Sequence, residues 1–268
     1  MKIINRKGYS ILMALAGVAA LISSGCSESE KKNELAKKEE AIIKKDEPLK
    51  VLIVTGGCCH DYEFQSAAML AGIPKHAKVD ITLVNEGKGT DAKIPLYDDP
   101  NWAKPYDVII HNECFANTKD EAYIRKITEA HKAGTPAVVV HCAMHTYRSA
   151  EIDDWREFLG VTSKHHEHQS KYPVKVVKVD HPVMKNFPTD WTTPMDELYI
   201  ITKVWPKTTV LATSKSEKSG EENPVIWAND FHGTRVLGTT YGHTNDTFSD
   251  PVFIKLLADA VVWAAGEN

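Results

Sequence analysis

From about residue 50 onward, short apolar runs alternate with segments of helical character. A run such as KVLIVT at residues 50–55 is typical of a strand buried on both faces. Strands that alternate with helices favour a parallel, doubly wound sheet. This part of the chain therefore predicts strands at 50–55, 79–84, 107–111 and 137–141, and helices at 64–71 and 120–133.

The second half of the chain is richer in strands. It predicts strands at 174–179, 198–204, 209–213, 225–228 and 235–241, followed by a closing amphipathic helix at 251–264. No internal repeat and no linker interrupts the chain after residue 49. We therefore predict one α/β domain over residues 50–268, with a mostly parallel, flavodoxin-like sheet in a three-layer α/β/α arrangement.

The first 25 residues have the features of an export signal. Basic residues precede an apolar stretch from Ile11 to Ile22, and small residues then lead to Cys26. This order predicts a signal peptide with a lipoprotein cleavage site, although Ser23 stands where an aliphatic residue is usual. Cys26 would carry the lipid, and the charged residues 26–49 would form a tether. The expected location is the periplasm or cell surface of a bacterium; a plainly cleaved signal is the alternative.

Composition narrows the function classes. The chain is 43% hydrophobic, so a sizeable core is expected, and its formal net charge is −4. There is no long Lys/Arg tract, which argues against a protein that binds nucleic acid by neutralising phosphates. Neither G-x-G-x-x-G nor a P-loop occurs, so no nicotinamide or nucleoside triphosphate is implied. A small-molecule partner is expected, and homo-oligomerisation stays open.

Titratable residues follow four of the predicted strands. In open α/β sheets the site lies beyond the carboxyl ends of the strands. Four clusters at this one edge therefore predict a polar site. The clusters are Cys58, Cys59, His60 and Asp61; His111, Asn112, Glu113 and Cys114; His141, Cys142, His145 and Arg148; and Tyr241, His243, Asn245 and Asp246.

Several of these segments resemble one known family. The sequence is similar to the trehalose-utilisation (ThuA-like) family in VLIVTGGCCHDYEF at 51–64, DVIIHNE at 107–113, AGTPAVVVHCAMHTYR at 133–148 and NPVIWANDFHGTRVLGTTYGH at 223–243. Shorter matches are WREFLGV at 155–161, DHPVMKNFP at 180–188, DELY at 196–199 and WAAG at 263–266. The resemblance implies a class I glutamine amidotransferase-like fold. It also implies a role with trehalose-type disaccharides or their 3-keto derivatives.

The amidotransferase-like fold raises the question of a cysteine nucleophile. Cys142 follows an apolar strand, and His243 could serve as its base. A nucleophile elbow requires small neighbours two residues away on either side, whereas Val140 and Met144 stand there. We therefore expect Cys142 to be a packing residue. Adjacent Cys58 and Cys59 are poorly spaced for a metal; one of them could pair with Cys114 or Cys142, or all four could be buried free thiols.

Two further segments are candidates for the site. In KHHEH at 164–168, His165 and His168 would share one face of a helix or turn and could hold zinc or manganese, with His60, Glu113 or Glu197 as a third ligand. The alternative is a pair of loop histidines that bind a sugar or solvent. In DELY, Glu197 and Tyr199 share a strand face. The resemblance favours Glu197 as the residue in the cleft.

Two functional hypotheses follow. The first is an enzyme in which His60, His141 or His243 removes a proton next to a sugar carbonyl, while Glu113 and Arg148 hold hydroxyls or an oxyanion. The second is a carbohydrate-binding lipoprotein without catalysis. In either case the substrate-binding residues would be Asp61, Asn112, His145, Arg148, Glu197, Tyr199 and Asn245.

Overall fold

The computed structural model describes residues 47–267. The predicted signal peptide, Cys26 and the charged tether up to residue 46 lie outside the described residues, so their predictions stay untested. Within residues 47–267, none of the helices is both long enough and apolar enough to span a membrane.

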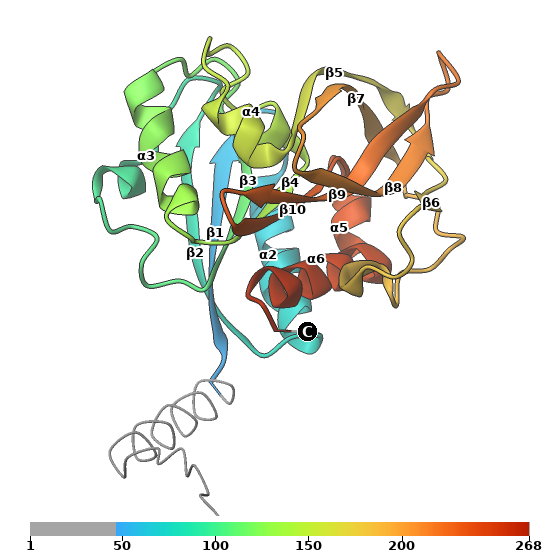
Figure 1. Ribbon diagram of the computed structural model, residues 1–268, viewed down its shortest axis with the longest axis horizontal. Helices are drawn as coiled ribbons and strands as arrows, with labels where there is room; N and C mark the ends of the chain where they lie inside the picture. Colours follow the sequence, from blue (N-terminus) through green and yellow to red (C-terminus); the bar gives the residue numbers. More distant parts are fainter. Residues whose placement is uncertain (1–46, 268) are drawn as a thin grey trace, which may run out of the picture. The chain divides into compact units, whose positions relative to one another are not determined.

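An eight-stranded sheet forms the centre of the domain (Figure 1), in the order β2-β1-β3-β4-β10-β9-β8-β6. The first five strands in this order are parallel, and the last three run antiparallel to their neighbours. The strands are β1 (Leu49–Gly57), β2 (Val79–Lys88), β3 (Val108–Cys114), β4 (Ala137–Val140), β6 (Lys175–Val176), β8 (Thr208–Lys215), β9 (Glu222–Phe231) and β10 (Thr234–Thr239). The predicted doubly wound, mostly parallel α/β sheet is confirmed.

Helices cover both faces of this sheet, which gives the predicted three layers. Alternate residues of β1 point to opposite faces: Val51 and Ile53 join one apolar core, and Leu52 and Val54 join the other. The first core packs beneath α2 (Tyr62–Gly72) and α6 (Pro251–Ala264) (Figure 1). The second core packs beneath α3 (Glu121–Lys132) and α4 (Asp154–Leu159). The short helix α5 (Asn245–Ser249) directly precedes α6.

A separate two-stranded sheet corrects one prediction. It consists of antiparallel β5 (Val161–Ser170) and β7 (Asp196–Val204). The predicted strand at 198–204 therefore does not belong to the main sheet. The predicted helix or turn at His165–His168 is wrong, because these residues are part of β5. Pairing with the more apolar β7 outweighs the weak strand signal of this polar segment.

Close contact between β9 and β10 depends on a glycine. Gly238 pairs with Trp227 across the two strands, and Trp227 is fully buried, with its indole N–H donating to the carbonyl of Leu159 at 2.7 Å. A Cβ at position 238 would lie 2.1 Å from Cζ2 of Trp227. The ring therefore occupies the space that any larger residue at 238 would need.

We expect Gly238→Ala to lower the free energy of unfolding by about 1–3 kcal/mol or more, because it overpacks a closed core. Urea denaturation of the variant and the wild type measures this. Trp227→Phe gives the matched background, since a smaller ring makes room for the methyl group. The cost of Gly238→Ala should be smaller in that background; an equal cost would contradict steric conflict with Trp227 as the cause.

Candidate active site

Three histidines from different strand ends meet at the carboxyl edge of the sheet. His60 follows β1, His141 follows β4 and His243 follows β10. One ring nitrogen of each lies within 4.8 Å of the other two. The ring centroids are 4.9 Å apart for His60–His141 and for His60–His243, and 5.4 Å apart for His141–His243. The structure thus brings together three residues that sequence analysis assigned to catalysis.

His141 is held in one orientation by its backbone and by one hydrogen bond. Its φ of +45° is in the left-handed region, which is unfavourable for a residue with a side chain. Its Nδ1 lies 2.6 Å from the carbonyl of Thr240, so Nδ1 carries the proton and Nε2 is the acceptor. Burial holds the pKa of His141 well below its usual range, and the ring is neutral. The strained residue of this turn is thus His141 rather than Cys142.

His60 lies against both of the other rings. Neither of its buried ring nitrogens has a hydrogen-bond partner among the described residues. Burial, and secondly the proximity of His243, lowers the pKa of His60 to about 4. His60 is therefore a neutral imidazole at pH 7, with a lone pair available to a ligand.

A carboxylate joins the histidines. Oε2 of Glu197 lies 3.2 Å from Nδ1 of His243, 3.4 Å from Nδ1 of His166 and 3.8 Å from Nε2 of His141. The Glu197 side chain is only 9% exposed. We call the group of His60, His141, His243 and Glu197 the histidine–glutamate cluster.

The neighbouring Asp196 fixes the loop that carries His243. Its fully buried carboxylate accepts hydrogen bonds from the backbone N–H groups of Gly242 at 3.0 Å and His243 at 3.2 Å, and from the Thr247 hydroxyl at 2.6 Å. Burial raises the pKa of Asp196 to about 6, against the opposing effect of these donors. Gln65 adds a bond from its amide to the Gly242 carbonyl.

A cavity of about 250 Å³ opens beside the cluster. It is lined by predicted binding residues His145, Arg148, Glu197 and Tyr199, together with His60, His166 and His243. The His145 ring stacks on Tyr199 at 4.0 Å, and burial lowers the pKa of His145 to about 3. Asp61 and Asn245 lie at a more open hollow on another side of His60 and His243, where the Asn245 amide donates to the Asp61 carboxylate at 3.0 Å.

Glu113 and Asn112 do not line either hollow. Glu113 is fully buried, and its Oε1 lies 2.8 Å from Nδ1 of His111. Nε2 of His111 lies 2.9 Å from Nε2 of His131, whose Nδ1 donates to the carbonyl of Thr135. The hydroxyl of Tyr97 also donates to Oε1 of Glu113, at 3.4 Å, so Glu113 belongs to a buried chain of polar groups in the core. Asn112 is also buried and donates to the side chain of Gln65.

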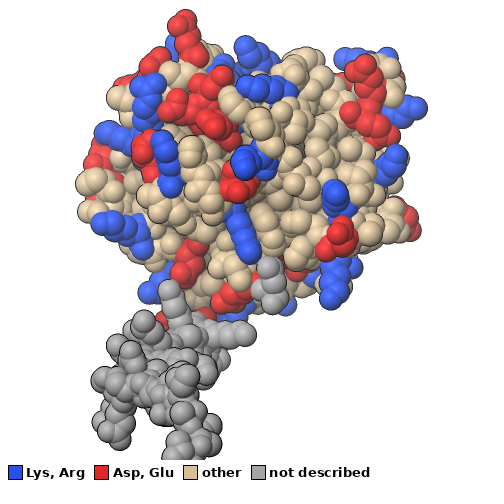
Figure 2. Space-filling view, viewed as in Figure 1, with Lys and Arg blue, Asp and Glu red and all other residues tan. Residues whose placement is uncertain are grey.

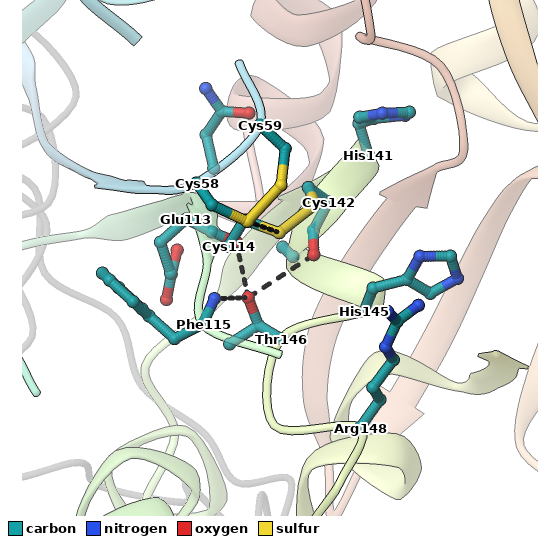
Figure 3. The surroundings of a disulfide bond; sticks show 12 residues. Cys58, Cys59, Glu113, Cys114, Phe115, His141, Cys142, His145, Thr146 and Arg148 are labelled. Carbon is teal, nitrogen blue, oxygen red and sulfur yellow. Dashed lines mark hydrogen bonds between the residues drawn. A yellow bond between two sulfur atoms is a disulfide. The ribbon is translucent and has the colours of Figure 1, made fainter. Parts of the chain in front are cut away.

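The four cysteines within residues 47–267 form two disulfides next to the cluster (Figure 3). Cys58 pairs with Cys59, and Cys114 pairs with Cys142. The expectation that Cys58 or Cys59 pairs with Cys114 or Cys142 is therefore wrong, and so is the alternative of four free thiols. The sulfur atoms of Cys58 and Cys114 are nevertheless 3.9 Å apart, because β1 and β3 end side by side. In Figure 3, Glu113 and His141 lie on opposite sides of the Cys114–Cys142 bond.

The predicted metal pair is exposed on β5. His168 lies 2.8 Å from a carboxylate oxygen of Glu217, and neither His165 nor His168 belongs to a group of three metal-ligating residues in the described part of the chain. Their neighbour His166, which sequence analysis passed over, faces Glu197 instead. Reading residues 161–170 as a strand opposite DELY would have pointed to His166, because it pairs with Tyr199 in the sheet.

This fold, with its polar cluster beyond the parallel strands, defines a class I glutamine amidotransferase-like α/β domain. The family model described as ThuA, trehalose utilisation, matches residues 50–264. The chain therefore belongs to the ThuA family. No curated protein matches it.

Solved structures agree on the fold. A ThuA-like protein from Parabacteroides merdae superposes with a TM-score of 0.68 at 21% identity, covering 82% of this chain and 90% of the other. One from Bacteroides uniformis gives a TM-score of 0.65 at 17% identity, covering 82% and 92%. A β-galactosidase from Rahnella gives a TM-score of 0.55 at 13% identity, but only 34% of that chain is covered. At these identities the likeness establishes the fold alone.

The buried polar chain predicts acid sensitivity. Burial, and secondly its neighbour His111, holds the pKa of His131 well below its usual value of 6.5. Below pH 6.5 the unfolded chain therefore gains a proton that the folded protein does not bind, and the free energy of unfolding falls. For one such histidine the loss is about 2 kcal/mol at pH 5.

Urea midpoints between pH 5 and pH 8 measure this effect. His131→Asn, which cannot titrate, should be less stable at pH 8 but should lose less stability than the wild type on acidification. Parallel pH profiles for the two proteins would contradict the assignment of this effect to His131.

Proposed function

We propose that this protein is an exported, lipid-anchored enzyme that acts on trehalose-type disaccharides or their 3-keto derivatives by proton transfer at the histidine–glutamate cluster. Membership of the ThuA family supports the substrate class. The observation that carries the reaction type is the convergence of Glu197 with neutral imidazoles at a polar cavity. A carboxylate and unprotonated imidazoles are the groups that can act as general bases toward a C–H bond.

A 3-keto sugar presents the chemistry that such a cluster can perform. The carbonyl at C3 acidifies the C–H bond at C2, so a base can take that proton while the electron pair moves onto the C3 oxygen. The enolate can then expel the group at C1 or be protonated again. Arg148 and the Tyr199 hydroxyl line the same cavity and could hold the developing oxyanion.

The surface fits a small-molecule partner. Acidic and basic side chains are interspersed on the face shown in Figure 2. The cavity beside the cluster, about 250 Å³, is of a size that takes one sugar ring at a time. The reacting ring would then occupy this cavity, with the rest of a disaccharide in the open hollow near Asp61 and Asn245.

The test is to incubate the full-length protein with trehalose and with 3-keto-trehalose and to follow the sugars by proton NMR. We expect new anomeric signals from the keto sugar. Glu197→Gln should lower kcat by about 10²–10⁴-fold, because it removes a proton acceptor without changing shape. Glu217→Gln, which alters an exposed carboxylate paired with His168, is the matched control and should leave turnover unchanged.

The second candidate function is carbohydrate binding without catalysis, favoured by the same polar lining. A sugar that raises the thermal midpoint of the protein but yields no product would replace the enzyme proposal with this one. Equal turnover by wild type and Glu197→Gln would contradict the role given to Glu197.

A further inference from the structure

We infer that His60, His141 and His243 form a binding site for one divalent first-row transition metal ion, with zinc the best match. Three imidazoles with an open fourth position are a recognised ligand set for catalytic zinc. This inference goes beyond the proposed function and does not depend on the identity of the substrate. It also replaces the metal site predicted at His165 and His168.

The ligand atoms come from a rigid frame. His60, His141 and His243 follow strands β1, β4 and β10, which belong to one sheet, so their backbones are fixed relative to one another. One nitrogen from each ring lies within 4.8 Å of the others. Residues from different elements that converge in this way form a preorganised site, whereas His165 and His168 are neighbours on one exposed strand.

The hydrogen bonds of His141 and His243 determine which ring nitrogen of each could bind a metal. Metal-ligating histidines commonly donate their other ring N–H to a carbonyl or carboxylate. His141 does so, because its Nδ1 donates to the Thr240 carbonyl and its Nε2 faces the cluster. This Nε2 accepts a hydrogen bond from the Tyr199 hydroxyl at 3.2 Å, which a bound metal would replace. Nε2 of His243 lies 2.7 Å from the side-chain amide nitrogen of Gln169, from which it accepts a hydrogen bond. Metal binding through Nδ1 of His243 would therefore require the Gln169 amide to turn, so that its oxygen accepts a proton from Nε2.

Charge around the cluster also favours a cation. His60 has two buried ring nitrogens without a partner, and Nδ1 of His243 makes no hydrogen bond despite its closeness to Glu197. Within residues 47–267, Oε2 of Glu197 lies 3.2–3.8 Å from histidine nitrogens, and Glu197 forms no ion pair with Lys or Arg. Several electron-pair donors thus face a common point without a charged partner, an arrangement that a metal ion would stabilise.

With a bound ion, the histidines and Glu197 would have different roles. The three imidazoles would hold the metal, which polarises a sugar carbonyl or hydroxyl as a Lewis acid. Glu197, beside the ligands, would be left to accept the proton. The sulfur atoms of Cys114 and Cys142 also lie within 4.8 Å of a His60 nitrogen. They are joined in a disulfide, so we do not count them as metal ligands.

The experiment starts from the full-length protein, from which metal has been removed with a chelator. Zinc is then titrated into it in a calorimeter, and the zinc content after dialysis is measured separately. We expect one zinc ion per chain. His60→Ala and His243→Ala should each weaken binding by roughly 100-fold or more. The double variant His165→Ala/His168→Ala, which removes two exposed histidines outside the cluster, is the matched control and should bind zinc like the wild type.

Circular dichroism and thermal midpoints of the metal-free variants establish that each is folded. Cobalt(II) adds a second readout: nitrogen and oxygen ligation gives visible d–d bands without the near-ultraviolet band of a thiolate ligand. Three results would overturn the site. These are no zinc binding by the wild type, zinc binding by His60→Ala and by His243→Ala as tight as that of the wild type, and binding that appears only after the disulfides are reduced. Zinc binding without turnover of the keto sugar would support the metal site and contradict only the proposed enzymatic function.

Discussion

The buried carboxylate of Asp196 holds the site together. Asp196 is the first residue of β7, the strand that contains Glu197 and Tyr199. Its carboxylate accepts hydrogen bonds from the segment after β10 that contains His243. The Thr244 hydroxyl adds a hydrogen bond to the Met195 carbonyl at 2.6 Å, next to Asp196. A carboxylate that is withdrawn from water keeps its charge only if such donors replace the solvent, so loop and strand are fixed as one unit.

Parallel strands supply the second constraint. Because β1, β3, β4 and β10 run in one direction, the residues after their ends are neighbours although they are far apart in sequence. The chain turns sharply at these ends. His141 adopts a left-handed backbone conformation and contacts the Gly242 region, where a Cβ on Gly242 would lie 3.1 Å from the Cβ of His141. Strain at such a position is tolerated when the surrounding structure fixes it, and it is typical of functional residues.

Most of the sheet was predictable, because unbroken apolar runs signal buried parallel strands whatever their neighbours are. The grouping of His60, His141 and His243 followed from the same rule. What could not be predicted depends on side-chain direction and on polar strands. Glu113 lies one residue before the end of β3 but points into the core toward His111. Strand β5 is too polar to be recognised until β7 pairs with it. The disulfide pairing depends on distances at strand ends that sequence spacing does not encode.

The electrostatics of the cluster connect its structure to its chemistry. Burial keeps His60 and His141 neutral, so the groups that meet Glu197 offer lone pairs rather than positive charge. Because the same burial disfavours an added proton, these rings are weak bases, which leaves the carboxylate of Glu197 as the proposed base. A metal ion differs from a proton, because its charge is shared by several lone pairs and by the neighbouring carboxylate at once. The burial that keeps the histidines unprotonated therefore suits them to act as ligands, which must be deprotonated to bind a metal.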